Sequence, residues 1–273
     1  MATQLPRNPR KQGTTMSTSA EEPVERRLEG SVAVLTMRYR PHNLLGPTLM
    51  DPLIEGMEWA RDNGARAVLL QSGLRHFSAG ADLEALSASS RSSGRGGKLL
   101  QVFDELPIPV VAGVQGVCVG GGLELALACD IIVAAESAKL GSVEATIGLN
   151  PLMGAVQRLT QRAGAARAKE MAMLGRRYDA RTLERWGVLN RVVGDEQLAA
   201  TSMTLAQELA AGPTIAHAAT KALVRITVSE GVRAADEAMP DLQKPIFESE
   251  DFRSGVSAFK ANGRPGTAQF RGR

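Results

Sequence analysis

The stretch PVVAGVQGVCVGGGLELALACD, residues 109–130, decides the fold of this chain. It opens with β-branched residues behind a proline, which predicts a short buried strand. Three consecutive glycines follow at residues 120–122, and because they lack a Cβ the backbone can turn sharply there and approach a ligand. Leu123, Ala126 and Leu127 then recur at helical spacing. The sequence therefore predicts that a helix begins at the glycines.

The start of that helix is a favourable place for negative charge. The first N–H groups of a helix have no partner within it, and the helix dipole has its positive end there. Glu124 falls in the first turn, so a carboxylate comes close to these donors. A strand, a glycine turn and a helix that carries a glutamate are the parts needed to hold an oxyanion and to move a proton beside it.

The composition is typical of a soluble globular protein. The 273 residues are 44% hydrophobic, with 32 basic and 29 acidic residues that are mostly interspersed. No basic run with interleaved aromatic residues favours nucleic-acid binding, and no apolar run reaches the ~20 residues of a membrane span. Cys118 and Cys129 have neither CxxC spacing nor a histidine cluster beside them. We therefore expect buried thiols, no metal site and a cytoplasmic, reducing environment.

The chain divides into three parts. Residues 1–22 are polar, contain two prolines and predict a disordered tail. Over residues 23–197, strand-like and helix-like segments alternate, which predicts an α/β catalytic core with parallel strand pairing. In residues 198–273 only helical patterns remain.

Two local features carry further expectations. The segment SASSRSSGRGG, residues 87–97, has almost nothing to bury and predicts a mobile surface loop, with a flap over a pocket as the functional alternative. In the C-terminal part, prolines are expected to separate the helices, because proline cannot donate the helical hydrogen bond. These prolines are Pro213, Pro240 and Pro245.

Several familiar catalytic patterns are absent. The glycine spacing does not match GxGxxG, and neither GxxxxGK[ST] nor GxSxG occurs. The histidines are His42, His76 and His217, and we expect each to be structural or exposed. Carboxylate and backbone-amide chemistry remains.

A second small-residue turn and a second glutamate extend this chemistry. FSAGADL, residues 77–83, follows a predicted buried strand and places only small residues where the backbone would approach a ligand. Glu144 follows a strand, a polar turn and a glycine, so it can return to the same end of the fold as Glu124. Taken singly, Glu124 is equally explained as a helix-start residue and Glu144 as a solvent-exposed turn residue.

Together, FSAGADL and VCVGGGLEL resemble the motifs of the crotonase superfamily, whose best-known members are enoyl-CoA hydratases. The resemblance extends from about residue 24 to the C-terminus. It implies a spiral of ββα turns followed by C-terminal helices that form homotrimers, often doubled to hexamers. It also implies an acyl-CoA substrate and no cofactor, because coenzyme A is part of the substrate.

The resemblance implies a role for individual residues. The backbone N–H groups of Ala81 and Gly121 would form an oxyanion hole for a thioester enolate. Members that hydrate a double bond carry two glutamates, and these match Glu124, which would activate water, and Glu144, which would exchange the proton at Cα. Isomerases of the superfamily typically keep only the acid that matches Glu144. The pair therefore favours a hydratase, with an isomerase or a non-catalytic acyl-CoA binder as alternatives.

The resemblance also implies where coenzyme A and the acyl group bind. Basic residues near the first strand and near the C-terminus would hold the phosphates, the latter group being lent by a neighbouring subunit. The candidates for binding coenzyme A are Arg38 and Arg40 near the first strand and Phe259 and Lys260 near the C-terminus, and further substrate contacts are expected at Ala79, Asp82, Leu83, Gly120 and Leu152.

One segment departs from the family pattern. Residues 151–159 are PLMGAVQRL where many hydratases have PGAGGTQRL, so Leu152 replaces a glycine whose amide helps to hold the attacking water. Two interpretations are open. Leu152 and Met153 reshape the acyl pocket and exclude water, or both side chains point into the core.

Overall fold

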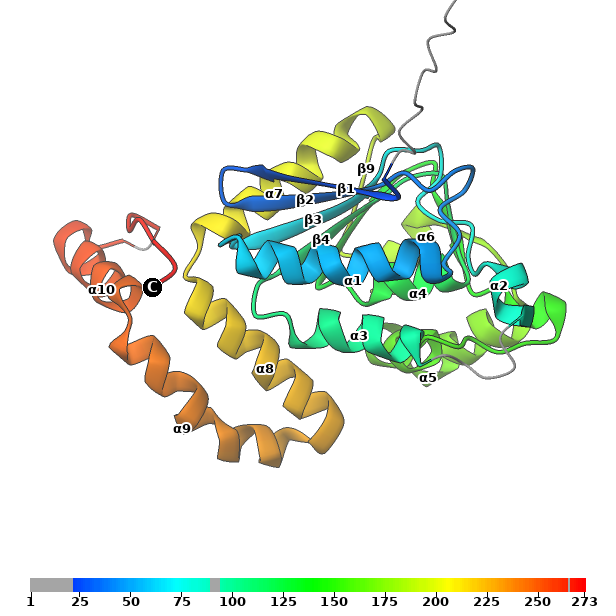
Figure 1. Ribbon diagram of the computed structural model, residues 1–273. Helices are drawn as coiled ribbons and strands as arrows, with labels where there is room; N and C mark the ends of the chain where they lie inside the picture. Colours follow the sequence, from blue (N-terminus) through cyan, green and yellow to red (C-terminus); the bar gives the residue numbers. More distant parts are fainter. Residues whose placement is uncertain (1–21, 89–93, 265) are drawn as a thin grey trace, which may run out of the picture.

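The computed structural model describes residues 22–88, 94–264 and 266–273, so the predicted tail lies outside the described residues apart from its last position (Figure 1). The larger of two sheets has the strand order β1-β2-β3-β4-β6-β9, in which β1 is antiparallel to β2 and the other pairs are parallel. Its strands are Val24–Glu29 (β1), Val32–Met37 (β2), Ala67–Ser72 (β3), Val110–Val114 (β4), Ile131–Ala135 (β6) and Arg191–Val193 (β9).

The smaller sheet carries the glycine turn. Its order is β5-β7-β8, with β5 parallel to β7 and β7 antiparallel to β8. The strands are Val117–Val119 (β5), Lys139–Gly141 (β7) and Tyr178–Asp179 (β8). The alternation of strands and helices confirms the predicted α/β core, and the helix predicted at the glycines begins at Gly121.

Helices cover both faces of the larger sheet. Figure 1 shows α7 on one side and α1, with α3 beyond it, on the other. The helices of this core region are α1 (Pro47–Asp62), α2 (Leu83–Ala88), α3 (Arg95–Glu105), α4 (Gly121–Leu127), α5 (Ala155–Leu174), α6 (Ala180–Arg185) and α7 (Leu198–Ala211), with 3-10 turns η1 (Glu144–Ile147) and η2 (Asp195–Gln197). Covered on both faces, β2, β3 and β4 consist of nearly unbroken apolar runs, as parallel strands usually do.

The expectation of a loop over residues 87–97 is wrong at both ends. Ser87 belongs to α2, and α3 already begins at Arg95. Helix α3 buries Leu99 and Phe103 against the core, and its first turn includes the glycines of the predicted loop. The middle of the predicted loop, residues 89–93, lies outside the described residues.

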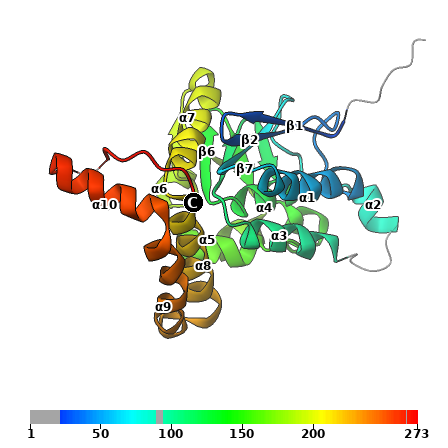
Figure 2. The same ribbon diagram turned by 60° about the vertical axis from the view of Figure 1, so that its left-hand side comes forward.

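The C-terminal helices stand apart from the sheet, as the rotated view makes plain (Figure 2). They are α8 (Thr214–Glu230), α9 (Val232–Glu248) and α10 (Glu250–Asn262). The predicted break points are partly wrong, because Pro240 and Pro245 lie inside α9. The chain turns instead at Gly231, whose φ of 94° suits glycine, and at Ser249, whose side chain accepts a hydrogen bond from Phe252 N.

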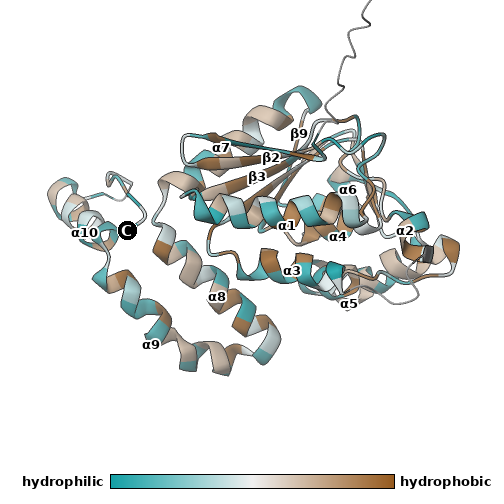
Figure 3. Ribbon diagram, in the orientation of Figure 1, coloured by the Kyte–Doolittle hydropathy of each residue, from teal (hydrophilic) through white to brown (hydrophobic). Residues whose placement is uncertain are grey.

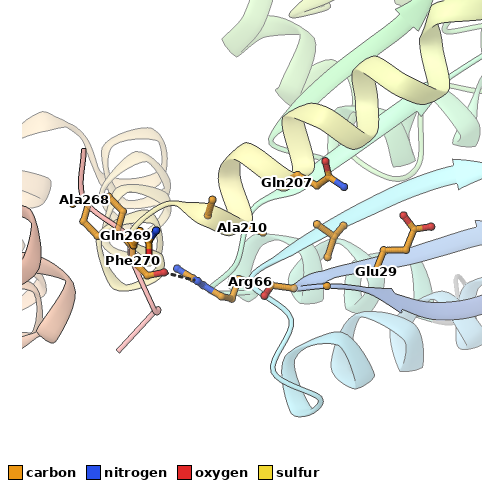
Figure 4. Close-up of a pocket in the computed structure, with 11 residues that line it drawn as sticks. Glu29, Arg66, Gln207, Ala210, Ala268, Gln269 and Phe270 are labelled. Carbon is orange, nitrogen blue, oxygen red and sulfur yellow. Dashed lines mark hydrogen bonds between the residues drawn. The ribbon is translucent and has the colours of Figure 1, made fainter. Parts of the chain in front are cut away.

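The last residues of the chain fasten α10 to the core. Asp251 is buried, and its carboxylate accepts hydrogen bonds from Arg271 N (2.6 Å) and Gly272 N (2.8 Å). Arg66, just before β3, donates to Phe270 O (3.0 Å) and to Gly212 O (2.6 Å), as Figure 4 shows for Phe270. Residues 268–270 of this C-terminal segment line an open cavity of about 780 Å³, together with the turn after β1 and the end of α7.

The glycine turn and the FSAGADL loop are interlocked. Ser78 N donates to Val117 O, and Val119 N donates to Ser78 O, each over 3.2 Å. A Cβ placed on Gly122 would lie only 2.6 Å from Ser78 O and 2.7 Å from Ser78 Cβ. The two loops therefore touch through a position that only glycine can occupy.

We expect Gly122→Ala to lower the free energy of unfolding by about 1–3 kcal/mol, because the added methyl collides with main chain that is hydrogen-bonded on both sides. Gly97→Ala is the matched control: Gly97 is also helical, but a Cβ there meets nothing within 4 Å. The control should be neutral or stabilising by up to about 1 kcal/mol. Urea unfolding of both variants measures the difference, and equal stabilities would contradict the contact.

Candidate active site

Two backbone amides meet where the interlocked loops cross. Ala81 N lies 3.5 Å from the place that a Cβ on Gly121 would take, so the two main chains are in contact. Leu45 N donates to Gly80 O and Asp82 N donates to Leu45 O, which turns the intervening N–H of Ala81 away from Leu45. Within residues 22–88, 94–264 and 266–273, neither Ala81 N nor Gly121 N donates a hydrogen bond. The structure thus brings together two free donors that the sequence separates by 40 positions.

The turn that presents Gly121 depends on its neighbour. Gly120 has a φ of 53° and a ψ of −128°, a conformation that side chains disfavour, and it precedes the first residue of α4. Its amide donates to Gly141 O at the end of β7 over 3.0 Å. Gly120 is therefore fixed by strand pairing on one side and begins the helix on the other.

Glu124 is buried one helical turn after Gly120. Its Oε1 accepts hydrogen bonds from Met153 N (2.5 Å) and from Ala155 N (3.2 Å) at the start of α5. Burial raises the pKa of this carboxyl from 4.5 to about 7, the two amides oppose the rise, and the charge of Glu144 adds to it. A group with a pKa near neutrality can both accept and release a proton at physiological pH.

Glu144 approaches the same turn from the other side. It is buried at the first position of η1, and its Oε2 accepts a hydrogen bond from Ser142 Oγ (2.8 Å). Its Oε1 has no partner among the described residues and lies 3.3 Å from the place of a Cβ on Gly120. One glutamate therefore follows the glycine turn in α4, and the carboxylate of the other lies against that turn.

The segment that departs from the family pattern is not simply core. The side chain of Leu152 is 55% exposed, which contradicts an inward orientation for this residue. Met153 is partly buried, and its Cγ lies 2.8 Å from the place of a Cβ on Gly96 in the first turn of α3. Of these two side chains, only that of Met153 packs inward, and the Met153 amide donates to Glu124.

The expected contacts for coenzyme A and the acyl group are scattered. Arg38 forms an ion pair with Glu25 (2.7 Å), and Asp82 accepts hydrogen bonds from the first amides of α2. Ala79 N is tied to His42 O (3.0 Å), and Leu83 is exposed at the start of α2. Ala79, Asp82 and Leu83 belong to the FSAGADL loop itself, whereas Arg38 follows β2 and is held by its ion pair.

Phe259 and Lys260 lie elsewhere. Both belong to α10, which Figure 1 places at the opposite end of the molecule from α2. Within one chain they do not reach the site.

A basic cluster that the sequence did not predict lies beside the FSAGADL loop and consists of His42, Arg75, His76 and Arg177. The rings of His42 and His76 are 5.9 Å apart, and His76 Nδ1 accepts a hydrogen bond from Val117 N (3.1 Å). The pKa of His76 is lowered first by its burial and then by the charges of Arg75, His42 and Arg177. In the described parts of the chain no ion pair engages Arg75 or Arg177. The Arg75-His76 pair directly before the motif is the signal in the sequence that could have identified the cluster.

The family model for "Enoyl-CoA hydratase/isomerase" matches residues 27–270 of this sequence. The chain belongs to the enoyl-CoA hydratase/isomerase family. Its expected crotonase fold is also that of solved enoyl-CoA hydratases. The enzyme from Bacillus anthracis has a TM-score of 0.84 at 27% identity, over 92% of this chain and all of that one. The enzyme from Polaromonas sp. JS666 has a TM-score of 0.83 at 28% identity, over 91% and 99% of the two chains.

Named relatives of this family member include two kinds of enzyme. A protein of Rhizobium meliloti (strain 1021) named "Probable enoyl-CoA hydratase" is 32% identical over 243 residues, which is 85% of this chain and 93% of the relative. The "Carnitinyl-CoA dehydratase" of Salmonella heidelberg (strain SL476) is 40% identical over 202 residues, 71% and 77% of the two chains.

Two features are absent from the described residues. No group of three or more His, Cys, Asp or Glu side chains in residues 22–88, 94–264 and 266–273 is arranged to hold a metal ion. In the same residues no helix combines the length and the apolar content needed to cross a bilayer.

We expect Glu124→Gln to stabilise the fold above pH 7. Because the pKa of Glu124 is about 7 in the folded chain and near 4.5 when unfolded, the wild type loses stability as the pH rises between these values. Glutamine mimics the protonated acid, so the variant should gain about 2–3 kcal/mol relative to the wild type at pH 8 and little at pH 4.5. Urea unfolding across this range measures the gain, and a difference independent of pH would refute it.

Proposed function

We propose that this member of the family is an enoyl-CoA hydratase that adds water reversibly to a 2-enoyl-CoA thioester. The observation that carries the proposal is the pair of buried carboxylates, Glu124 and Glu144, on the two sides of a glycine turn beside two free amides. Hydration and dehydration through an enolate need two proton carriers and an oxyanion site. The relatives named as a hydratase and as a carnitinyl-CoA dehydratase point to the same reaction type.

In the proposed reaction, ionised Glu124 takes a proton from water as the water oxygen bonds to Cβ of the substrate. The electron pair of the double bond moves toward the thioester, and the negative charge on its oxygen is held by the N–H groups of Ala81 and Gly121. Each such preset donor commonly contributes about 3 kcal/mol of transition-state stabilisation. Protonated Glu144 then gives its proton to Cα. Glu124 gains one proton from water as Glu144 gives one to Cα, so the carboxyl pair holds one proton before and after the step.

We also propose that the basic cluster of His42, Arg75, His76 and Arg177 receives the phosphates of coenzyme A. It borders the loop that carries Ala81, and its arginines have no ion-pair partner in the described chain. Phosphates are well matched to guanidinium donors. Arg38 is a weaker candidate, because its guanidinium already pairs with Glu25.

As part of the same proposal, the chain forms a homotrimer or a hexamer of two trimers. Apolar side chains remain exposed on the C-terminal helices, where Figure 3 shows brown segments among the hydrophilic ones. They are Val224, Val228, Val232, Phe247, Phe252, Val256 and Phe259. A neighbouring subunit that covers them would bring Phe259 and Lys260 of one chain toward the site of another.

The first test follows thioester absorbance with 2-enoyl-CoA and 3-enoyl-CoA substrates. Hydration consumes the conjugated thioester, whereas an isomerase acting through Glu144 alone produces it from the 3-enoyl substrate. Tight binding without change would support a non-catalytic acyl-CoA binder whose Leu152 excludes water.

Glu144→Gln should lower either activity by roughly 10²- to 10⁴-fold, because the Cα proton loses its carrier. Glu124→Gln should lower hydration by a similar factor and isomerisation far less. Steady-state kinetics of both variants measure these effects. Full activity of Glu144→Gln would remove the mechanism.

For Arg75→Ala we expect KM for a CoA thioester to rise roughly tenfold, with kcat little changed, because the residue meets phosphate and not the reacting carbons. The same acyl group on N-acetylcysteamine, which has no phosphates, should show no such rise. Arg61→Ala, at an exposed arginine bonded to Asp62, serves as the control. An equal rise with both thioesters would place Arg75 outside the phosphate site.

A further inference from the structure

Ser142 is a buried hydroxyl in direct contact with one of the two carboxylates. It follows the last residue of β7, has no exposed surface and donates from Oγ to Glu144 Oε2 over 2.8 Å. Because Oε2 accepts this bond, rotation of the carboxylate is restrained and Oε1 is left as the oxygen without a partner among the described residues. The remaining oxygen points at the glycine turn.

Other contacts hold the main chain around Glu144 but leave its side chain free. Thr146 N and Thr146 Oγ1 both donate to Val143 O, and Leu149 N donates to Glu144 O. Of the described residues, only Ser142 hydrogen-bonds the carboxylate itself. Removing its hydroxyl would leave the backbone in place and release the carboxylate.

Ser142 is tied to the glycine turn through a rigid route. Its neighbour Gly141 accepts the hydrogen bond from Gly120 N. Strands β5 and β7 pair along their whole length, from Val117 opposite Lys139 to Val119 opposite Gly141. The serine hydroxyl, the free oxygen of Glu144 and the amide of Gly121 are therefore positioned by one short segment of sheet.

We propose that Ser142 is a positioning residue that decides which oxygen of Glu144 carries the transferred proton. This inference rests on the proposed function. With Oε2 occupied as acceptor for the hydroxyl, the proton resides on Oε1, the oxygen that faces the turn where the substrate Cα would lie. Ser142 itself neither gains nor loses a proton.

The test compares Ser142→Ala with Ser202→Ala. Ser202 is an equally buried serine whose Oγ has no partner among the described residues, so its removal controls for a lost buried hydroxyl. For Ser142→Ala we expect kcat to fall roughly 10- to 100-fold with KM within about twofold, because a misplaced proton carrier slows chemistry and not binding. Ser202→Ala should retain the wild-type kcat.

Ser142→Cys keeps the size of the side chain and a weak donor, so its kcat should lie between those of wild type and Ser142→Ala. This variant also serves if alanine prevents folding, and thermal unfolding is recorded for each protein. Wild-type kcat in Ser142→Ala, a change confined to KM, or an equal loss in Ser202→Ala would overturn the role of Ser142.

Exchange of the α-proton of a saturated acyl-CoA in D₂O, followed by NMR, separates the two proposals. A wild type that neither hydrates nor exchanges overturns the proposed function. An active wild type with unimpaired exchange in Ser142→Ala overturns only the inference about Ser142.

Discussion

The close contact between Ser78 and Gly122 is the constraint on which the site depends. Ser78 is buried, exchanges main-chain hydrogen bonds with β5 and donates from Oγ to Asn43 O (2.7 Å). Gly122 leaves room for it by having no side chain. Because the loops cross at this distance, Ala81 N and Gly121 become neighbours, and the helix that follows places Glu124 beside them. The close packing of the two loops thus determines which donors and which carboxylate come together.

The two glutamates are buried for the same site but are held differently. Glu124 accepts two backbone amides and still has a raised pKa, because removal from water outweighs those bonds. Glu144 has one hydroxyl partner and one oxygen without any. The unpartnered oxygen of Glu144 is the one that lies against the glycine turn.

Strands and helix starts that depend on a local residue pattern could be predicted from the sequence. The apolar run behind Pro109 located β4, and the glycines located the start of α4. Pairing of two distant motifs could be inferred only through the resemblance to a family. The edge strand β1 has little apolar alternation and was not predicted. Pro213 lies at the break between α7 and α8 as predicted, but the later breaks follow Gly231 and Ser249 and not Pro240 and Pro245.

Side-chain environment was the least predictable level. That Arg38 pairs with Glu25, that Leu152 is exposed and that Ser142 bonds Glu144 all depend on tertiary contacts. Arg177 reaches the basic cluster because β8 pairs with β7, and such a short strand gives no periodic signal.

Substitutions are expected to be tolerated poorly at the crowded glycine turn and better at the exposed positions around it. A Cβ on Gly120 would lie 3.3 Å from Glu144 Oε1 and 3.8 Å from Gly80 Cα, and the Gly120 amide bonds Gly141 O at the end of β7, so a side chain there would disturb all three. Leu83 and Leu152 border the same loops with largely exposed side chains. Engineering toward other acyl groups would therefore begin with combinatorial libraries at such rim positions, and leave the glycine turn intact.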